Sequence, residues 1–312
     1  MTPQDFQLFL ARLGELTGEQ TRLLGAALTG SRADAIGLIE ARFSEAAACP
    51  HCGSRHVKKN GHAHGLQRYR CRGECGRTFT ALTGTPLSGL HKREVWLAYA
   101  RAMIEHASVR KAAGICGIDK TTSFRWRHRF LDGLREAVPS RLEDIVEVDE
   151  TFFLESFKGA RELPRPARKR GGKAEKRGLS AEQIPVLIAR DRRGATLDAR
   201  LDDLSDAAVE GVLAPRINAT NVLVSDGAER YRRIADQRGI LHVSLNASAG
   251  ERTYGVYHIQ NVNAYTSRLK GWMQPFRGVA TKNLPNYLGW HRGLDREHGS
   301  PAPAAFLAAA IG

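Results

Sequence analysis

Two aspartates, one within a strand-like segment and one at the end of another, have the side chains best suited to metal chemistry. Asp149 lies in the apolar segment IVEVDETFF, residues 145–153, and Asp226 follows the apolar residues 222–224. Burying a carboxylate without a partner is costly, so Asp149 requires a basic side chain, solvent or a metal ion. Acids at the carboxyl ends of strands in one sheet can share divalent cations. For Asp226 alone, capping of the helix that follows is an equally good explanation.

Asn263 and Lys270 form a second candidate pair, in a segment that reads as a helix. They are seven residues apart, which at about 100° per residue places them within about 20° of each other on one helical face. An amide oxygen can ligate a metal ion, and an ammonium group further along can hold a phosphate. Taken alone the pair is unspecific, because Asn and Lys are common on helices.

Two close cysteine pairs predict a zinc ribbon. The pairs have two and three intervening residues, lie 18 residues apart, and consist of Cys49, Cys52, Cys71 and Cys75. Gly53 and Gly76 follow the second cysteine of each pair, where a tight turn aims backbone N–H groups at sulfur. Four thiolates leave no open position, so this zinc is expected to be structural. Disulfides are the alternative, and Cys116 is expected to be a buried apolar residue.

A helix-turn-helix is predicted between the ribbon and the acidic segment. Ser108 suits the N-cap of a short helix through Ala113, Gly117 supplies a turn, and Asp119 can cap a third helix rich in hydroxyl and arginine side chains. Small hydroxyls followed by arginines suit a major-groove reader. The aromatic side chains of that helix, Phe124 and Trp126, are expected in its core.

The composition predicts a polyanionic partner. The 312 residues carry a net charge of +14 with a pI near 9.9, and residues 158–177 contain nine Lys or Arg against two Glu. No segment resembles a membrane span or a secretory signal, so we expect a cytoplasmic, nucleoid-associated protein. A ribbon that binds protein is the alternative to one that binds nucleic acid. The residues expected to contact DNA are Lys58, Lys59, Arg68, Arg70, Arg125, Arg127, Arg129, Lys169, Arg170 and Lys173.

The order of these parts resembles the bacterial insertion-sequence transposases of the DDE superfamily, in the subgroup with an N-terminal zinc ribbon. The resemblance rests on RYRC and CGRTF in the ribbon, VDETFF, VSDGA and the segment HIQNVNAYTSRLKGW, and it covers about residues 46–296. It implies an α/β fold with an RNase H-like mixed sheet as its core. The implied domains are an N-terminal helical region (1–45), the zinc ribbon (46–85), the helix-turn-helix region (86–140), the catalytic domain (141–298) and a C-terminal tail (299–312).

The resemblance also implies the site and its cofactors. Asp149 and Asp226 match the first two metal-binding acids of the family. Asn263 falls on the third position, and Lys270 falls on the lysine that follows two helical turns later. Most of the superfamily has Glu where this chain has Asn263, although some members of the subgroup are similar in having Asn. The implied cofactors are two Mg²⁺ or Mn²⁺ ions and one structural Zn²⁺. Substitutes for the third ligand are Glu251 and His258, with Glu147 as an accessory acid.

The implied activity is cleavage of the element's ends and transfer of the freed strands to target DNA. The implied partner is double-stranded DNA, bound by a homodimer or a higher oligomer. Two other interpretations of the sequence remain open. One is a DNA-binding protein without catalysis, which needs no pair of strand-borne acids. The other is an RNase H-like nuclease, which cleaves DNA without joining it.

Overall fold

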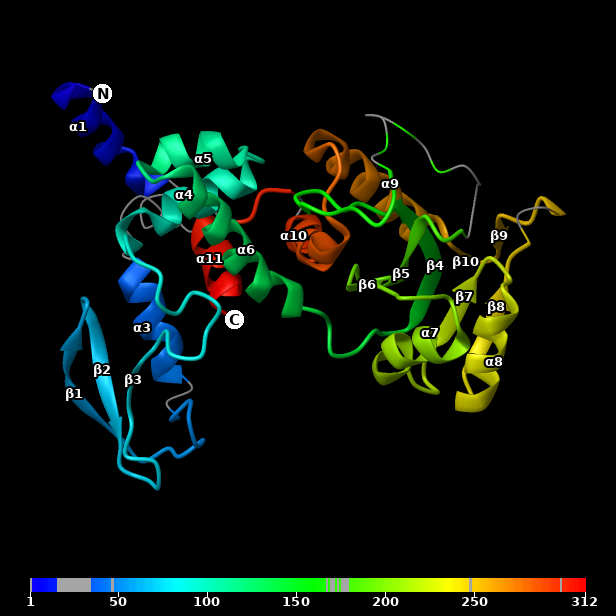
Figure 1. Ribbon diagram of the computed structural model, residues 1–312, viewed down its shortest axis with the longest axis horizontal. Coiled ribbons are helices and arrows are strands. Elements are labelled where there is room, and N and C mark those ends of the chain that lie inside the picture. Colours follow the sequence, from blue (N-terminus) through cyan, green and yellow to red (C-terminus); the bar gives the residue numbers. More distant parts are fainter. Residues whose placement is uncertain are drawn as a thin grey trace. The chain divides into compact units, whose positions relative to one another are not determined.

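The chain divides into two compact units in the computed structural model (Figure 1). The first unit contains residues 1–133 and 299–312, and the second contains residues 134–298. The structure describes residues 2–15, 35–45, 48–166, 168, 172, 174, 180–246, 249–297 and 299–312.

The first unit begins with short helices and a three-stranded antiparallel sheet. The helices are α1 (Pro3–Ala11), the 3₁₀-helix η1 (Leu13–Glu15) and α3 (Ala35–Glu45), and the strands, in their spatial order, are β1 (Val57–Ala63), β2 (Leu66–Cys71) and β3 (Thr78–Thr80). Tyr69 and Phe79 face each other across β2 and β3, and Phe43 of α3 packs on both rings. Three aromatic rings thus form the small core that covers one face of this sheet.

The remainder of the first unit is helical. Its elements are η2 (Arg93–Val95), α4 (Trp96–Ile104), α5 (Val109–Cys116), α6 (Lys120–Glu136), which runs on into the second unit, and α11 (Pro303–Ile311). Residues 299–312, expected as a tail, therefore contain a helix. A Cβ atom at Gly133 would lie 2.3 Å from the carbonyl oxygen of Ala310, so glycine is what allows the close approach of α6 and α11.

The helix boundaries of the helix-turn-helix segment follow the predicted signals. The Ser108 side chain accepts the Lys111 N–H (3.2 Å) at the start of α5, and Gly117 ends that helix with a φ of 59°. Asp119 accepts the Thr121 N–H (2.6 Å) at the start of α6. Helix α5 is longer than expected, because it ends at Cys116 instead of Ala113.

The second unit is built on a five-stranded mixed sheet. In spatial order its strands are β6 (Thr196–Arg200), β5 (Gln183–Asp191), β4 (Ile145–Leu154), β7 (Val222–Ser225) and β8 (Leu241–Ser244). Strand β5 pairs antiparallel with both β4 and β6. On the other side, β4 pairs parallel with β7, and β7 pairs parallel with β8. A two-stranded hairpin, β9 (Thr253–Tyr254) and β10 (Tyr257–His258), precedes α9. The mixed α/β fold predicted from the sequence is confirmed.

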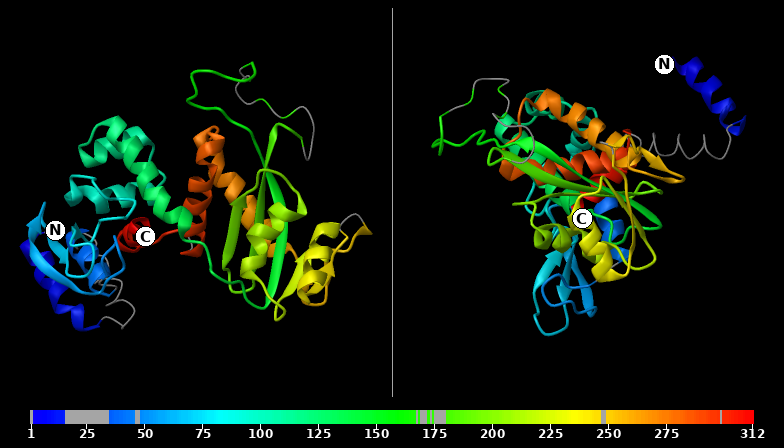
Figure 2. Two further views of the ribbon diagram at one scale, coloured as in Figure 1. Left: turned by 60° about the horizontal axis from the view of Figure 1, so that its bottom comes forward. Right: turned by 90° about the vertical axis from the view of Figure 1, so that its right-hand side faces the viewer.

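Helices cover both faces of this sheet, as Figure 2 shows. Val146, Val148 and Leu187 pack on one face against α7 (Asp206–Leu213) and α8 (Glu229–Arg238), near η3 (Ala214–Arg216). Val186 and Ile188 pack on the other face against α9 (Gln260–Met273) and α10 (Leu284–Arg296), with η5 (Gln274–Phe276) and η6 (Thr281–Asn283) between these helices. Alternate residues of β5 are thus buried on opposite faces, which explains why the strand is apolar throughout. None of the helices in the described part of the chain has the length and apolar character to cross a membrane.

Candidate functional site

The parallel pairing of β4 with β7 brings Asp149 and Asp226 to the same level of the sheet. The pairs Ile145–Val222, Val146–Leu223 and Glu147–Val224 define the register. Each aspartate stands two residues beyond the last of these pairs, so a continuation of the same register sets Asp149 opposite Asp226. Both side chains therefore lie at the carboxyl end of β7, which is where open α/β sheets place their sites.

The Asp149 carboxyl carries the most perturbed acid pKa that the structure assigns to this region. Burial raises the pKa of Asp149 to about 6, and the negative charges of Asp226 and Glu150 act in the same direction. The Glu150 N–H, which donates to Asp149 Oδ1 at 2.8 Å, and the ammonium group of Lys270 oppose the rise in this pKa. Among the described residues, no Lys, Arg or His forms an ion pair with Asp149. Its charge is therefore left for another cation to balance.

Asp226 lies in the turn between β7 and α8. Its Oδ1 accepts the Ala228 N–H at 3.2 Å, immediately before α8, and Gly227 between them has a φ of 95°. This bond closes the turn before the helix but leaves the first N–H groups of α8 without a side-chain cap, so the capping interpretation is wrong. The side chain is exposed at the sheet end, and its charge acts on both Asp149 and Glu150.

Asn263 and Lys270 lie along the same edge of the buried stripe of α9. Val262, Tyr265 and Leu269 form that stripe, which packs on β5. Asn263 and Lys270 each follow a stripe residue by one position and are exposed. Lys270 is close enough to Asp149 for its charge to lower the pKa of that carboxyl. The amide of Asn263 is neutral, and its assignment as third metal ligand stays a prediction.

Glu147 is not an accessory metal ligand but the cap of α9. Its Oε2 accepts the N–H groups of Asn261 (2.7 Å) and Val262 (3.0 Å), and its Oε1 accepts the Asn261 Nδ2–H (3.0 Å). Arg192 Nη1 lies 2.7 Å and His258 Nδ1 3.3 Å from the same carboxylate, whose side chain is fully buried. Because Ile259 at the helix start has no capping side chain, Glu147 supplies from β4 the acceptor that an N-cap residue normally provides.

The two proposed substitutes for the third ligand have other partners. His258 is held by Arg192 and Glu147, as described above. Glu251 accepts the Asn246 N–H at 3.2 Å in an exposed turn. Neither contact involves Asp149 or Asp226.

Glu150 is a buried acid to which the sequence suggested no role. It points to the opposite face of β4 from Asp149, beside Tyr231 and 3.6 Å from Arg230 Nη1, both on α8. Burial raises the pKa of Glu150, while Tyr231 and Arg230 lower it. The sequence shows Glu150 as a charged residue within a strand rich in apolar residues. Its contacts with Tyr231 and Arg230 of α8 explain why an acid can occupy that position.

The four cysteines of the ribbon converge on one point. Their sulfur atoms lie within 4.8 Å of one another, with Cys49 and Cys75 at 3.5 Å and Cys52 and Cys71 at 3.6 Å. A tetrahedral zinc ion with bonds of about 2.3 Å separates its sulfur ligands by about 3.8 Å, so the cluster has the size to hold one ion. Burial opposes ionisation of Cys49, but N–H groups of His51 and Cys52 lower its pKa to about 7. All five cysteines are free, which argues against disulfides.

Basic side chains gather on one face of the ribbon sheet. Lys58 pairs with Arg70 across β1 and β2, and Arg68 lies two residues away on the same face. All three are exposed, and the opposite face carries the aromatic core. Lys59 is also exposed, at the edge where the register of β1 shifts. These four residues are available to a polyanion.

Two of the three arginines expected to contact DNA from α6 donate to backbone carbonyl groups. Arg127 is 3% exposed and donates to the Ala107 carbonyl oxygen at 2.6 Å. Arg129 donates to the carbonyl oxygens of Pro86 and Ser88. The buried guanidinium of Arg127 is not available to DNA, so that prediction is wrong, whereas DNA contact by the partly buried Arg129 stays a prediction. Arg125 is exposed.

The aromatic residues of α6 also divide. Trp126 is buried against Trp96 and Tyr99, as expected, whereas Phe124 is 52% exposed and contacts only the His128 ring among the aromatic pairs of the described chain. Phe124 shares the exposed face of α6 with Thr121 and Arg125. The other predicted DNA contacts, Lys169, Arg170 and Lys173, lie outside the described residues.

Known proteins resemble this chain in sequence and, more distantly, in structure. Residues 141–290 match the ISXO2-like transposase domain. An uncharacterized protein in transposable element ISH50 of Halobacterium salinarum is 29% identical over 255 residues, which are 80% of this chain and 86% of that protein.

Two solved structures show a distant likeness. A Mos1 pre-cleavage transpososome is 13% identical, with a TM-score of 0.25 over 69% of this chain and 79% of the Mos1 chain. A simian T-cell lymphotropic virus intasome is 11% identical, with a TM-score of 0.29 over 62% of this chain and 66% of the intasome chain.

Proposed function

We propose that this chain binds the ends of its own insertion sequence, cuts them, and joins them to target DNA, because residues 141–290 match the ISXO2-like transposase domain. The observation that carries the proposal is the meeting of Asp149 and Asp226 at one sheet end, where Asp149 is half-buried and has no ion-pair partner among the described residues. A nucleic-acid regulator has no use for such an arrangement, because an unbalanced buried charge destabilises the fold.

Two magnesium ions suit this set of donors. Carboxylate and amide oxygens are the ligands that Mg²⁺ and Mn²⁺ prefer, and the raised pKa of Asp149 reflects a site that gains from a bound cation. Asp149, Asp226 and Asn263 would together hold these ions through their side-chain oxygens. When bound, such ions stabilise the entering and leaving oxygens of an in-line displacement at phosphorus and activate the attacking water or 3′-hydroxyl.

The protein's own groups orient the strand. The positive charge of Lys270 lowers the pKa of Asp149, so its ammonium group lies close to that carboxyl. We assign Lys270 to the non-bridging oxygens of the scissile phosphate. Glu147 keeps α9, and with it Asn263 and Lys270, in register with β4 through the capping bonds at Asn261 and Val262. The rigid pairing of helix and strand thereby holds the donors in place before DNA arrives.

The first unit supplies DNA recognition in this proposal. Lys58, Arg68 and Arg70 contact phosphates from the ribbon, and the exposed face of α6 enters a groove through Thr121 and Arg125. One zinc ion bound by the four cysteines keeps the ribbon folded. Cutting and joining two ends requires two active sites, which a homodimer or a larger oligomer on DNA provides. Such a protein acts on chromosomal DNA at the nucleoid.

The test uses a DNA fragment that carries both ends of the element with their flanking sequence. Asp149→Ala and Asp226→Ala should each abolish strand cleavage, with a loss of at least about 10³-fold, while binding of the ends persists. Asp202→Ala is the matched control. The Asp202 side chain is 88% exposed, and its ion pair is with Arg200 of the edge strand β6. Normal cleavage by either active-site variant would refute the proposed site.

The same assay separates the competing functions. Metal-dependent nicking with no joined products identifies a nuclease on this core. Binding with no nicking by the wild-type protein, at any Mg²⁺ or Mn²⁺ concentration, identifies a DNA-binding protein without catalysis. Joined products that depend on Asp149 and on added metal establish the transposase.

A further inference from the structure

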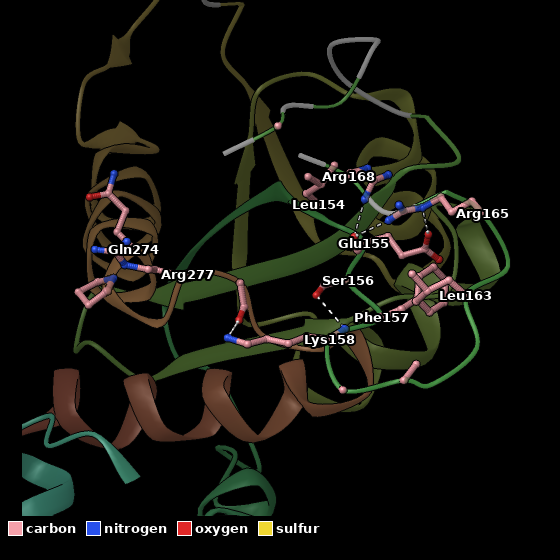
Figure 3. Close-up of a pocket in the computed structure, with 15 residues that line it drawn as sticks. Leu154, Glu155, Ser156, Phe157, Lys158, Leu163, Arg165, Arg168, Gln274 and Arg277 are labelled. Carbon is pink, nitrogen blue, oxygen red and sulfur yellow. Dashed lines mark hydrogen bonds and ion pairs between the residues drawn. The ribbon is translucent and has the colours of Figure 1, made fainter. Parts of the chain in front are cut away.

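A large basic pocket lies beside the proposed active site in the second unit (Figure 3). Its volume is about 1000 Å³, and it is formed by the chain that follows β4, from Leu154 to Arg168, and by the segment Gln274–Gly278 at the end of α9. Figure 3 shows Arg165 and Arg168 on one side of the pocket and Arg277 on the other, with Lys158 between them. Four cationic side chains thus surround a space that is not part of the proposed metal site.

The charges of the pocket are only partly balanced. Arg168 donates to Glu182 Oε1 and to the Glu155 carbonyl oxygen, and Arg165 Nε lies 3.8 Å from Glu155 Oε2. Lys158 Nζ donates to the carbonyl oxygens of Phe276 (3.1 Å) and Gly278 (2.8 Å), which are neutral acceptors. Of the described residues that line the pocket, Glu155 is the single acid. The pocket therefore keeps a positive charge that favours an anion.

Arg277 occupies a strained backbone position at this pocket. Its φ of 50° lies in the left-handed region, which side chains with a Cβ atom disfavour and glycine adopts freely. The guanidinium group is exposed, and no hydrogen bond or ion pair holds it within the described chain. A position where glycine would be more stable thus carries an exposed cation in the lining of the pocket, which is the pattern of a residue kept for binding.

The pocket connects to the proposed active site through a smaller cavity. That cavity has a volume of about 340 Å³, is lined by Lys270, Phe152 and Phe153, and shares Leu154, Gln274 and Gly278 with the basic pocket. Phe152 and Phe153 continue β4 beyond Asp149. A chain of cations thus leads from Lys270 to Arg277 and on to Arg165.

We propose that the basic pocket receives a single-stranded stretch of DNA that leaves the active site. The pocket has a volume of about 1000 Å³, and its lining combines four cations with the aromatic ring of Phe157, which is the combination that binds an unpaired strand. Arg277 and Lys158 contact its phosphates, and Phe157, which already lies 5.4 Å below the Arg165 guanidinium, offers a face for a base. The inference rests on the proposed function, since it assumes that the strand comes from that site.

The test compares two DNA probes with the full-length protein and no added divalent metal. One is a blunt 20-base-pair duplex of arbitrary sequence, and the other is the same duplex with a tail of five thymidines, at the 3′ or the 5′ end. The wild-type protein should bind one of the tailed duplexes about fivefold to tenfold more tightly than the blunt one. Arg277→Gly should abolish the higher affinity for the tailed duplex, while the affinity for the blunt duplex stays unchanged. It should also reduce, by about one, the slope with which the logarithm of the binding constant for the tailed duplex falls with the logarithm of salt concentration.

Glycine at position 277 also separates binding from folding. Because it relieves the left-handed backbone, Arg277→Gly should leave Tm unchanged or raise it by up to about 3 °C. Arg238→Ala is the charge-matched control, since Arg238 is an exposed cation on α8, which covers the opposite face of the sheet from α9. It should keep the full gain from the tail.

Two outcomes would overturn the inference: neither tail improves binding to the wild-type protein, or the gain persists in Arg277→Gly. Asp149→Ala in the metal-dependent cleavage assay described under the proposed function makes failure of that function distinguishable from failure of the pocket. Cleavage that survives Asp149→Ala while the tail gain still depends on Arg277 rejects the active site and supports the strand pocket. Loss of cleavage in Asp149→Ala together with an absent tail gain rejects the pocket and supports the active site.

Discussion

Asp149 and Asp226 stand level with each other on two adjacent parallel strands, each two residues past the last backbone pair of β4 and β7. Their proximity has an energetic consequence, because each carboxylate makes ionisation of the other harder. At neutral pH the repulsion between the two carboxylates therefore destabilises the folded protein, and a bound cation relieves it.

The first prediction concerns pH and stability. The folded-state pKa of Asp149 is about 6, above its value of about 3.9 in an unfolded chain, so this group stabilises the fold below about pH 4 and loses that contribution as the pH rises through about 6. Asp149→Asn should therefore match the wild type at pH 4 and exceed it by about 3 kcal/mol at pH 8 without Mg²⁺. Thermal unfolding of both proteins between pH 4 and pH 8 measures the difference. A constant difference across this range would contradict the assigned pKa, and Asp202→Asn is the exposed control.

The second prediction concerns the cap of α9. Glu147→Ala leaves the Arg192 guanidinium and two N–H groups without their buried acceptor, and should lower the free energy of unfolding by about 3–5 kcal/mol. Glu147→Gln keeps an acceptor and should cost less. Denaturant unfolding measures both, and Glu143→Ala is the control, since Glu143 is a half-exposed acid paired with Arg193 and should change stability by less than about 0.5 kcal/mol. Equal effects of Glu147→Ala and Glu143→Ala would argue against the cap.

The third prediction concerns the neutral third ligand. Asn263→Glu adds a negative charge to the proposed metal site and should lower the Mg²⁺ concentration at half-maximal cleavage, on the order of tenfold. Asn263→Gln keeps the amide and should not tighten binding. A metal titration of cleavage distinguishes the two variants. If Asn263→Glu leaves the Mg²⁺ requirement unchanged, another residue is the third ligand.

The fourth prediction concerns the ribbon. The purified protein should contain one zinc ion per chain, and Cys71→Ser should lose it because three thiolates no longer complete the tetrahedron. Cys116→Ser removes a buried thiol that lies outside the cluster and should retain the zinc. Elemental analysis of the three proteins is the measurement. A folded ribbon that holds no metal would contradict the zinc assignment.

Several features could be predicted from the sequence because they depend on residues that are close along the chain. The spacing of the cysteine pairs, the cap at Ser108 and the glycine at 117 are set by contacts within one turn. The strands that carry Asp149 and Asp226 followed from runs of apolar residues. What the sequence alone determined was therefore the elements, their order and which acids lie on or directly after a strand.

The tertiary structure decided what each side chain touches, because such contacts join residues far apart in the chain. Glu147 and Asp149 have the same residue class and the same face of β4, yet Glu147 meets Asn261, 114 residues later, and becomes a cap. Arg127 and Arg125 differ by two positions on α6, and the packing of that helix buries the first and exposes the second. Whether a charged group is satisfied within the protein or left for a ligand depends on these long-range contacts, and local periodicity carries no information about them.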